Sequence, residues 1–131
     1  MTLGGPKTPA NGATARPASP GTPAIDRAVL GEWLADDHAA INELLAVFRD
    51  SITTEQDKMT ELLASGDLDA YASAAHRLRG AALSMGARVL AELAGILYAS
   101  ARADDDVACR NGMTALRAQI DLVIAEIPGT T

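Results

Sequence analysis

One histidine in the middle of the chain has neighbours suited to phosphoryl chemistry. In the segment Ala75 to Ala87, Arg79 and Gly80 follow His76 by three and four residues, which places all three on one face of a helix. A neutral imidazole nitrogen is a nucleophile available near neutral pH, and the planar guanidinium of Arg79 matches phosphoryl oxygens. A glycine within a helix costs about 1 kcal/mol relative to alanine, so Gly80 indicates a need for space beside the ring. The spacing predicts a phosphorylatable histidine.

The imidazole is expected on the solvent side of its helix. With about 100° of rotation per residue, His76 projects about 120° from the centre of an apolar stripe. That stripe consists of Leu68, Tyr71, Ala75, Leu78 and Ala82.

The surroundings of His76 predict a docking surface. No acidic residue occurs between Asp69 and Glu92, so the arginines there form a predicted basic island that would steer an acidic partner and offset phosphoryl charge. Leu83 would add exposed apolar surface, and Ser84 either ends its helix or supports the ring indirectly. The residues predicted to contact a partner are Ala72, Arg77, Leu83, Ser84, Gly86 and Arg88.

This pattern resembles the motif of histidine-containing phosphotransfer (HPt) domains of bacterial two-component phosphorelays, which is roughly H-x-L-K-G with a second glycine further along. The matching positions are His76, Leu78, Arg79, Gly80 and Gly86. The resemblance implies that His76 is the phosphoryl carrier, and that Arg79 and Gly80 take the supporting roles of the family's lysine and glycine.

The resemblance extends from about Asp26 to Glu126 and includes an acidic residue, Asp67, before the histidine helix. Two positions depart from the family pattern. Arg79 replaces the usual lysine, which keeps the charge but changes the geometry, and Tyr98 follows Leu97 where a glutamate is common.

The spacing of apolar residues predicts helices throughout and no strand. Four long amphipathic helices with short connections predict an all-α fold, an antiparallel four-helix bundle, with a short additional N-terminal helix. In the short helix, Ile25, Val29, Leu30 and Trp33 are expected to face the bundle, and Val107 is expected on the apolar face of the last helix. The predicted segments are Asp26 to Leu34, a long helix from Asp36 or Asp37 to Gly66, Asp67 to about Ser84, a stretch around Val89 to Leu97, and a last helix from the aspartates at 104–106 to Pro128 and Gly129.

Composition predicts one domain preceded by a linker. Residues 1–24 hold all but one of the prolines and no acidic residue, which predicts a flexible Pro/Gly/Ala-rich linker, and residues 25–131 would form the helical domain. No segment resembles a secretory signal or is apolar for long enough to cross a bilayer, so a cytoplasmic location is expected.

Charge and cysteine content exclude several classes of function. Without Lys7 and Arg16 of the linker, 9 basic residues stand against 17 acidic ones in the helical domain, a net charge of −8 that disfavours nucleic acid. The single cysteine, Cys109, excludes an internal disulfide and a cysteine metal cluster. We expect no metal or cofactor in the chain itself, and any Mg²⁺ would belong to the partner.

The function expected from these features is reversible phosphoryl transfer. His76 would accept the group from a receiver-domain aspartate and pass it to another response regulator. The chain has no P-loop of the kind that binds nucleotides and no room for an ATP-binding domain, so it would carry the group without kinase activity of its own.

The implied partners are receiver domains, and the sequence leaves open whether the chain is a free-standing protein or part of a parent hybrid histidine kinase; the chain itself is expected to be monomeric. A helical docking module that is never phosphorylated stays open as an alternative. A hydrolase lacks a second reactive group near His76. His38, without a basic neighbour or nearby glycine, is interpreted as a solvated or packing residue.

Overall fold

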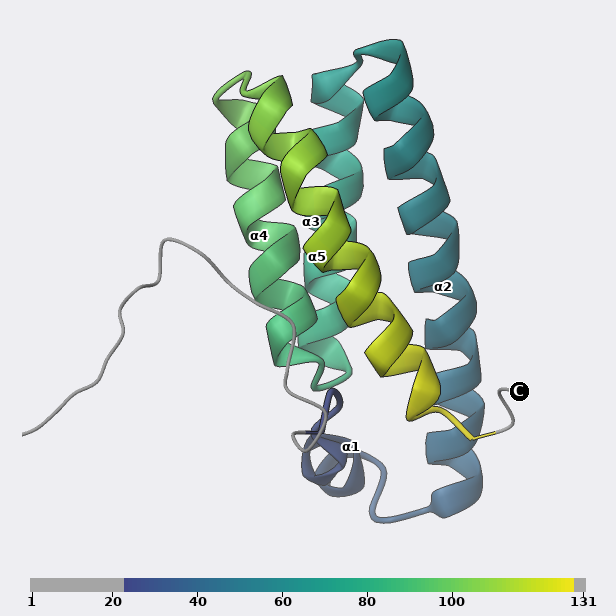
Figure 1. Ribbon diagram of the computed structural model, residues 1–131. Helices are drawn as coiled ribbons and strands as arrows, with labels where there is room; N and C mark the ends of the chain where they lie inside the picture. Colours follow the sequence, from purple (N-terminus) through teal and green to yellow (C-terminus); the bar gives the residue numbers. More distant parts are fainter. Residues whose placement is uncertain (1–22, 129–131) are drawn as a thin grey trace, which may run out of the picture.

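The computed structural model describes residues 23–128, in which five α-helices and no strand occur (Figure 1). The all-α prediction is therefore confirmed. Of the predicted linker, only Pro23 and Ala24 fall inside the described range, and Gly129 lies outside it. The helices are α1 (Arg27–Trp33), α2 (His38–Ser65), α3 (Leu68–Ser84), α4 (Arg88–Arg102) and α5 (Asp106–Ala125).

Helices α2 to α5 form the predicted antiparallel bundle, and α1 lies across one end of it (Figure 1). Each long helix packs against the next one in the chain, and α5 closes the ring by contacting α2. The α3–α4 pair has the most extensive contact. The alanines that both helices bury explain this close approach; they are Ala72, Ala74, Ala75, Ala82, Ala91, Ala94 and Ala101.

Aspartate side chains begin most of the helices. The carboxylate of Asp37 accepts a hydrogen bond from the Ala40 amide at the start of α2, and Asp67 does the same for Ala70 in α3. Such caps satisfy backbone N–H groups that have no partner within the helix. Asp26 and Asp105 cap α1 and α5 in the same way.

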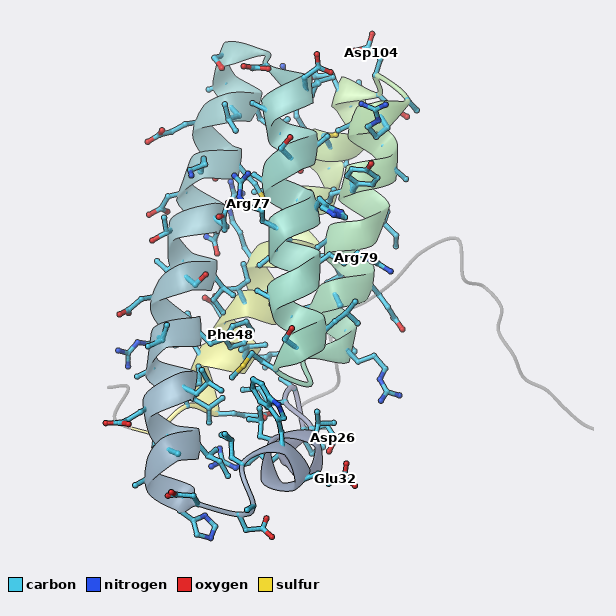
Figure 2. All side chains as sticks on the ribbon, turned by 180° about the vertical axis from the view of Figure 1, so that it is seen from behind. Asp26, Glu32, Phe48, Arg77, Arg79 and Asp104 are labelled. Carbon is cyan, nitrogen blue, oxygen red and sulfur yellow. The ribbon has the colours of Figure 1, made fainter. Side chains whose placement is uncertain are left out.

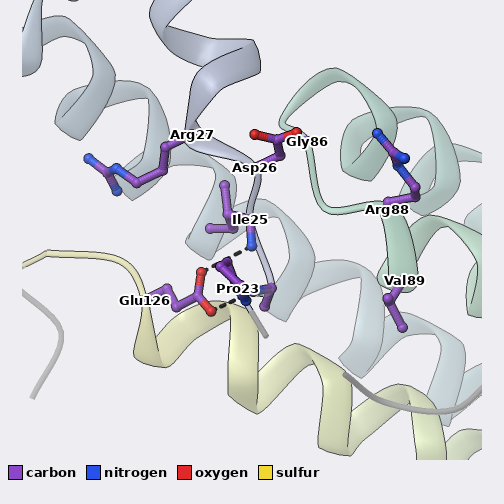
Figure 3. Close-up of a pocket in the computed structure, with 9 residues that line it drawn as sticks. Pro23, Ile25, Asp26, Arg27, Gly86, Arg88, Val89 and Glu126 are labelled. Carbon is purple, nitrogen blue, oxygen red and sulfur yellow. Dashed lines mark hydrogen bonds between the residues drawn. The ribbon is translucent and has the colours of Figure 1, made fainter. Parts of the chain in front are cut away.

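The segment before α1 is hydrogen-bonded to two parts of the bundle, the α3–α4 turn and the residue just after α5 (Figure 3). The backbone amides of Ala24 and Ile25 both donate to the carboxylate of Glu126, just after α5. The amide of Asp26 donates to the carbonyl of Gly86, between α3 and α4, at 2.8 Å. Ala24 and Ile25 are buried, so the packed domain includes the residues immediately before α1.

Three apolar side chains expected inside are exposed, which corrects the prediction for them. Val29 and Trp33 have exposed fractions of 37% and 67%, because the short α1 buries only the face that carries Leu30. Val107 is 65% exposed. The buried stripe of α5 begins at Cys109, and Val107 lies about 160° around the helix from that residue.

Candidate functional site

The imidazole of His76 lies on the exposed surface of α3, as the periodicity predicted. The stripe that α3 buries includes Tyr71, Ala75 and Leu78, and His76 falls outside it. Within the described part of the chain, the imidazole makes no hydrogen bond or ion pair with another residue. A nucleophilic nitrogen is therefore accessible to an approaching molecule.

Tyr98 of α4 contacts the His76 ring. The two ring centroids are 5.4 Å apart and the planes are inclined at 44°, a geometry within the range of favourable aromatic pairs. The sequence singled out Tyr98 only as a departure from a family pattern and did not predict this contact. The sequence placed Tyr98 on the helix that follows the histidine helix. To predict its contact with His76, one must also know how far α4 is shifted along its axis relative to α3.

Arg79 extends from α3 across α4. An ideal Cβ built on Gly95 of α4 would lie 3.3 Å from both the Cδ and the Nε of Arg79, so this glycine makes room for the arginine stem. Among the described residues, the Arg79 guanidinium has no hydrogen bond or ion pair. Its donors remain available to an anion beside His76, and Gly95 is a supporting residue that sequence reasoning missed.

Gly80 lies at an open part of the surface. A Cβ added there would meet no atom within 4 Å, apart from the helix's own backbone. The hydroxyl of Ser84 donates to the Gly80 carbonyl at 3.1 Å, and Ser84 is the last residue of α3. Ser84 therefore ends its helix and stabilises the backbone at Gly80, whereas the space above Gly80 stays free.

Arg77 is directed away from the site, which corrects its predicted place in a basic island. Its Nε and Nη2 donate to the Glu55 carboxylate of α2 at 3.1 and 3.3 Å. Figure 2 shows Arg77 on the α2 side of α3 and Arg79 on the α4 side. Residue 77 is rotated by about 100° from His76, which accounts for this separation.

Arg88 and Gly86 also lie away from His76. The contacts of His76 with Tyr98 and of Arg79 with Gly95 define the register of α3 and α4. Arg88 precedes Tyr98 by ten residues. It therefore lies about 15 Å along the α4 axis from the level of Tyr98 and His76. The basic island predicted from the sequence is thus reduced to Arg79 near the ring.

Gly86 has a structural role where the sequence predicted a partner contact. Its φ of +75° is strained for any residue with a side chain, and an added Cβ would lie 2.7 Å from the carbonyl oxygen of Asp26. Gly86 therefore allows the turn between α3 and α4 to pack on the segment before α1 (Figure 3). Ala72, also predicted to contact a partner, is buried in the core with 3% of its surface exposed, which corrects that prediction.

Apolar surface extends from the C-terminal end of α3 to α1. Leu83 is 49% exposed, as predicted, and it follows His76 by two helical turns on the same face. At this end of α3, a groove is lined by Trp33 of α1, Leu44 and Val47 of α2, and Met85 after α3. The exposed Trp33 was expected inside the bundle, so sequence reasoning missed this groove.

No metal site or membrane helix is present in the part of the chain that the structure describes. Residues 23–128 contain no cluster of three or more histidine, cysteine, aspartate and glutamate side chains that could hold an ion. The helices in this range are too short or too polar to span a bilayer. Cys109 of α5 is buried against α4, where its thiol donates to the carbonyl of Leu97 at 3.9 Å. Burial is the main reason that the pKa of this thiol is raised.

Comparison with known proteins identifies a family for this chain. A family model described as the Hpt domain matches residues 43–126, more than half of the chain. This range begins within α2 and includes His76, Arg79, Gly80 and Tyr98, but it excludes α1. No curated protein and no solved structure matches the chain.

Proposed function

Because the chain belongs to the Hpt domain family, whose members act in histidine phosphotransfer, we propose that His76 is its phosphoryl carrier. In this proposal His76 accepts the group from the phosphorylated aspartate of a receiver domain and passes it to another response regulator. The observation that carries the proposal is the combination of an exposed imidazole, an unpaired guanidinium and open space at Gly80 on one face of α3.

The proposed reaction is an in-line displacement at phosphorus. A neutral nitrogen of His76 forms the N–P bond while the bond from phosphorus to the aspartate oxygen breaks, and the aspartate leaves as a carboxylate. The imidazole then loses the proton of its other nitrogen to water, which leaves a phosphoramidate. Transfer to a second receiver reverses these steps.

Within this reaction, Arg79 is proposed to bind the phosphoryl oxygens. Its guanidinium is three residues from His76 on the same face, and no residue in the described range neutralises it. Charge-assisted hydrogen bonds of this kind stabilise the charge spread over the transferring group. Gly80 is proposed to let the partner approach closely, and Mg²⁺ would be held by the receiver.

The receiver is proposed to dock on Leu83 and on the apolar groove beside Trp33. Leu83 exposes apolar area two helical turns from the acceptor, the groove adds apolar area between α1 and α2, and burying both against a partner would be favourable. The groove also supports the alternative function, a docking module that is never phosphorylated, because such binding needs no chemistry at His76.

A labelling experiment distinguishes the two functions. We would incubate the chain with a receiver carrying a labelled aspartyl phosphate and map the label. Phosphotransfer predicts an acid-labile, alkali-stable phosphate on His76, and His76→Gln would abolish it while binding is retained. His38→Gln is the matched control, because His38 is also exposed on a helix but lacks the arginine and glycine neighbours. A stable complex without label would support docking alone.

The remaining proposals concern organisation and location. We propose that the helical domain is monomeric, because the four-helix core is closed on itself. A cytoplasmic location is proposed together with the receiver partners. The free, buried Cys109 is compatible with a reducing compartment.

A further inference from the structure

Tyr98 is an exposed aromatic residue whose contact is with the proposed acceptor. The chain has only two tyrosines, one tryptophan and one phenylalanine, and both Tyr71 and Phe48 are buried in the core. Tyr98 is instead 36% exposed and packs against the His76 ring. In the described range its hydroxyl makes no hydrogen bond. Neither core packing nor a polar contact of the hydroxyl explains a tyrosine here.

The backbone that carries Tyr98 is held firmly. Leu97, Ala94 and Ala101, at one, four and three residues from Tyr98 on α4, are all buried. Helix α4 packs against both α3 and α5. The tyrosine ring therefore extends from a rigid element, whereas the imidazole it contacts has no hydrogen bond to the described residues that could orient it.

From this geometry we infer that Tyr98 is the positioning residue for His76, a role that rests on the proposed phosphoryl transfer. By packing on the imidazole, the phenol ring restricts its rotation, so that a nucleophilic nitrogen stays directed outward. When the N–P bond forms and the aspartate carboxylate departs, the imidazole is cationic until its other nitrogen releases a proton to water. The electron-rich face of the tyrosine stabilises that cation. The aromatic ring, not the hydroxyl, performs this role.

The inference is tested by single-turnover transfer from a phosphorylated receiver, measured over a range of receiver concentrations. The maximal rate reports the transfer step and the half-saturating concentration reports docking. For Tyr98→Leu we expect a maximal rate lower by about threefold to tenfold with an unchanged half-saturating concentration, which is the effect of losing one aromatic pair. Tyr98→Phe keeps the ring and is expected to remain within about twofold of the original chain.

Two further measurements separate positioning from a loss of folding. Circular dichroism reports the helical fold of each variant, and Tyr98→Met is a second variant without a ring. In NMR spectra, the ring protons of His76 should lose the ring-current shift caused by Tyr98 in the leucine and methionine variants and keep it in Tyr98→Phe.

The outcomes identify which claim fails. If the maximal rates of folded Tyr98→Leu and Tyr98→Met equal that of the original chain, the positioning role is wrong. A change in the half-saturating concentration alone would also overturn it, because Tyr98 would then be a partner contact. In both cases His76 of the original chain is still labelled and the proposed function survives. Absence of label on His76 in the original chain would remove both proposals.

Discussion

Arg77 of α3 and Glu55 of α2, 22 residues apart in the sequence, are joined by two hydrogen bonds between the guanidinium and the carboxylate. The pair neutralises one of the two arginines that flank His76, whereas the other, Arg79, has no ion pair among the described residues. The same helix thus directs one arginine to α2 and the other across α4, and only the second is free for the proposed role in transfer.

Replacing the two arginines should therefore have different effects. Arg79→Ala is expected to lower the maximal transfer rate by about tenfold or more, which corresponds to losing one charge-assisted hydrogen bond, and Arg79→Lys should lose less. Arg77→Ala should leave that rate within about twofold and cost roughly 1 kcal/mol of stability, the range for exposed ion pairs. Transfer kinetics and urea unfolding of the three variants check this. Equal losses of rate in both alanine variants would contradict the assignment.

Replacing Gly80 and Gly86 by alanine should change the free energy of unfolding in opposite directions. Gly86→Ala places a side chain at positive φ and against the Asp26 carbonyl, so it should destabilise the fold by about 1–3 kcal/mol. Gly80→Ala adds its methyl group to open space on a helix and should stabilise by up to about 1 kcal/mol. Thermal unfolding measures both effects.

If Gly80 provides access to His76, the more stable Gly80→Ala variant should also transfer more slowly. A rate equal to that of the original chain would show that the space above Gly80 is not used by the partner.

The apolar surface at the α1 end should contribute to docking. Trp33→Ala and Leu83→Ala are each expected to weaken receiver binding by about tenfold or more, because truncation of a buried interface anchor costs about 2 kcal/mol. The unfolding free energy should change little, since both side chains are exposed. Calorimetric titration with a receiver measures the affinities. Val107→Ala, which removes an equally exposed residue at the start of α5, is the control and should bind normally.

Alkaline pH should destabilise the domain. Burial raises the pKa of the Cys109 thiol, with Asp105 and Asp106 adding to it, and burial also raises the pKa of the Tyr71 phenol. Both groups stay neutral in the fold at pH values where the unfolded chain ionises them. Their stabilisation is complete below the ordinary thiol pKa of about 8.5 and is lost as the pH rises toward the raised values, at up to about 1.4 kcal/mol per pH unit for each group.

Urea unfolding at about pH 7, 9 and 10.5 would measure this loss of stability. These pH values lie below, near and above the ordinary pKa values of the thiol and the phenol. Cys109→Ala should reduce the slope near pH 9 and keep the later fall that Tyr71 causes. An unchanged slope in that variant would exclude the thiol as its source.

The local sequence determined where most helices begin and which side chains of α3 are buried or exposed. The helix start at Asp67, the end of α2 at Gly66, the buried stripe of α3 and the exposed position of His76 were predicted correctly. The starts of α2 and α5 were predicted only to within neighbouring aspartates, and the structure selects Asp37 and Asp105. Each of these features depends on residues within about four positions of one another, because capping and the helical period are local.

Only the tertiary structure decided which groups surround the histidine. The contact of His76 with Tyr98, the pairing of Arg77 with Glu55, and the approach of Asp26 to Gly86 each join separate parts of the chain. The exposure of Trp33 has the same origin, because it depends on where α1 meets the bundle. Such contacts depend on the rotation and axial offset of packed helices, and a pattern of apolar residues along one helix specifies neither its partner's rotation nor that offset.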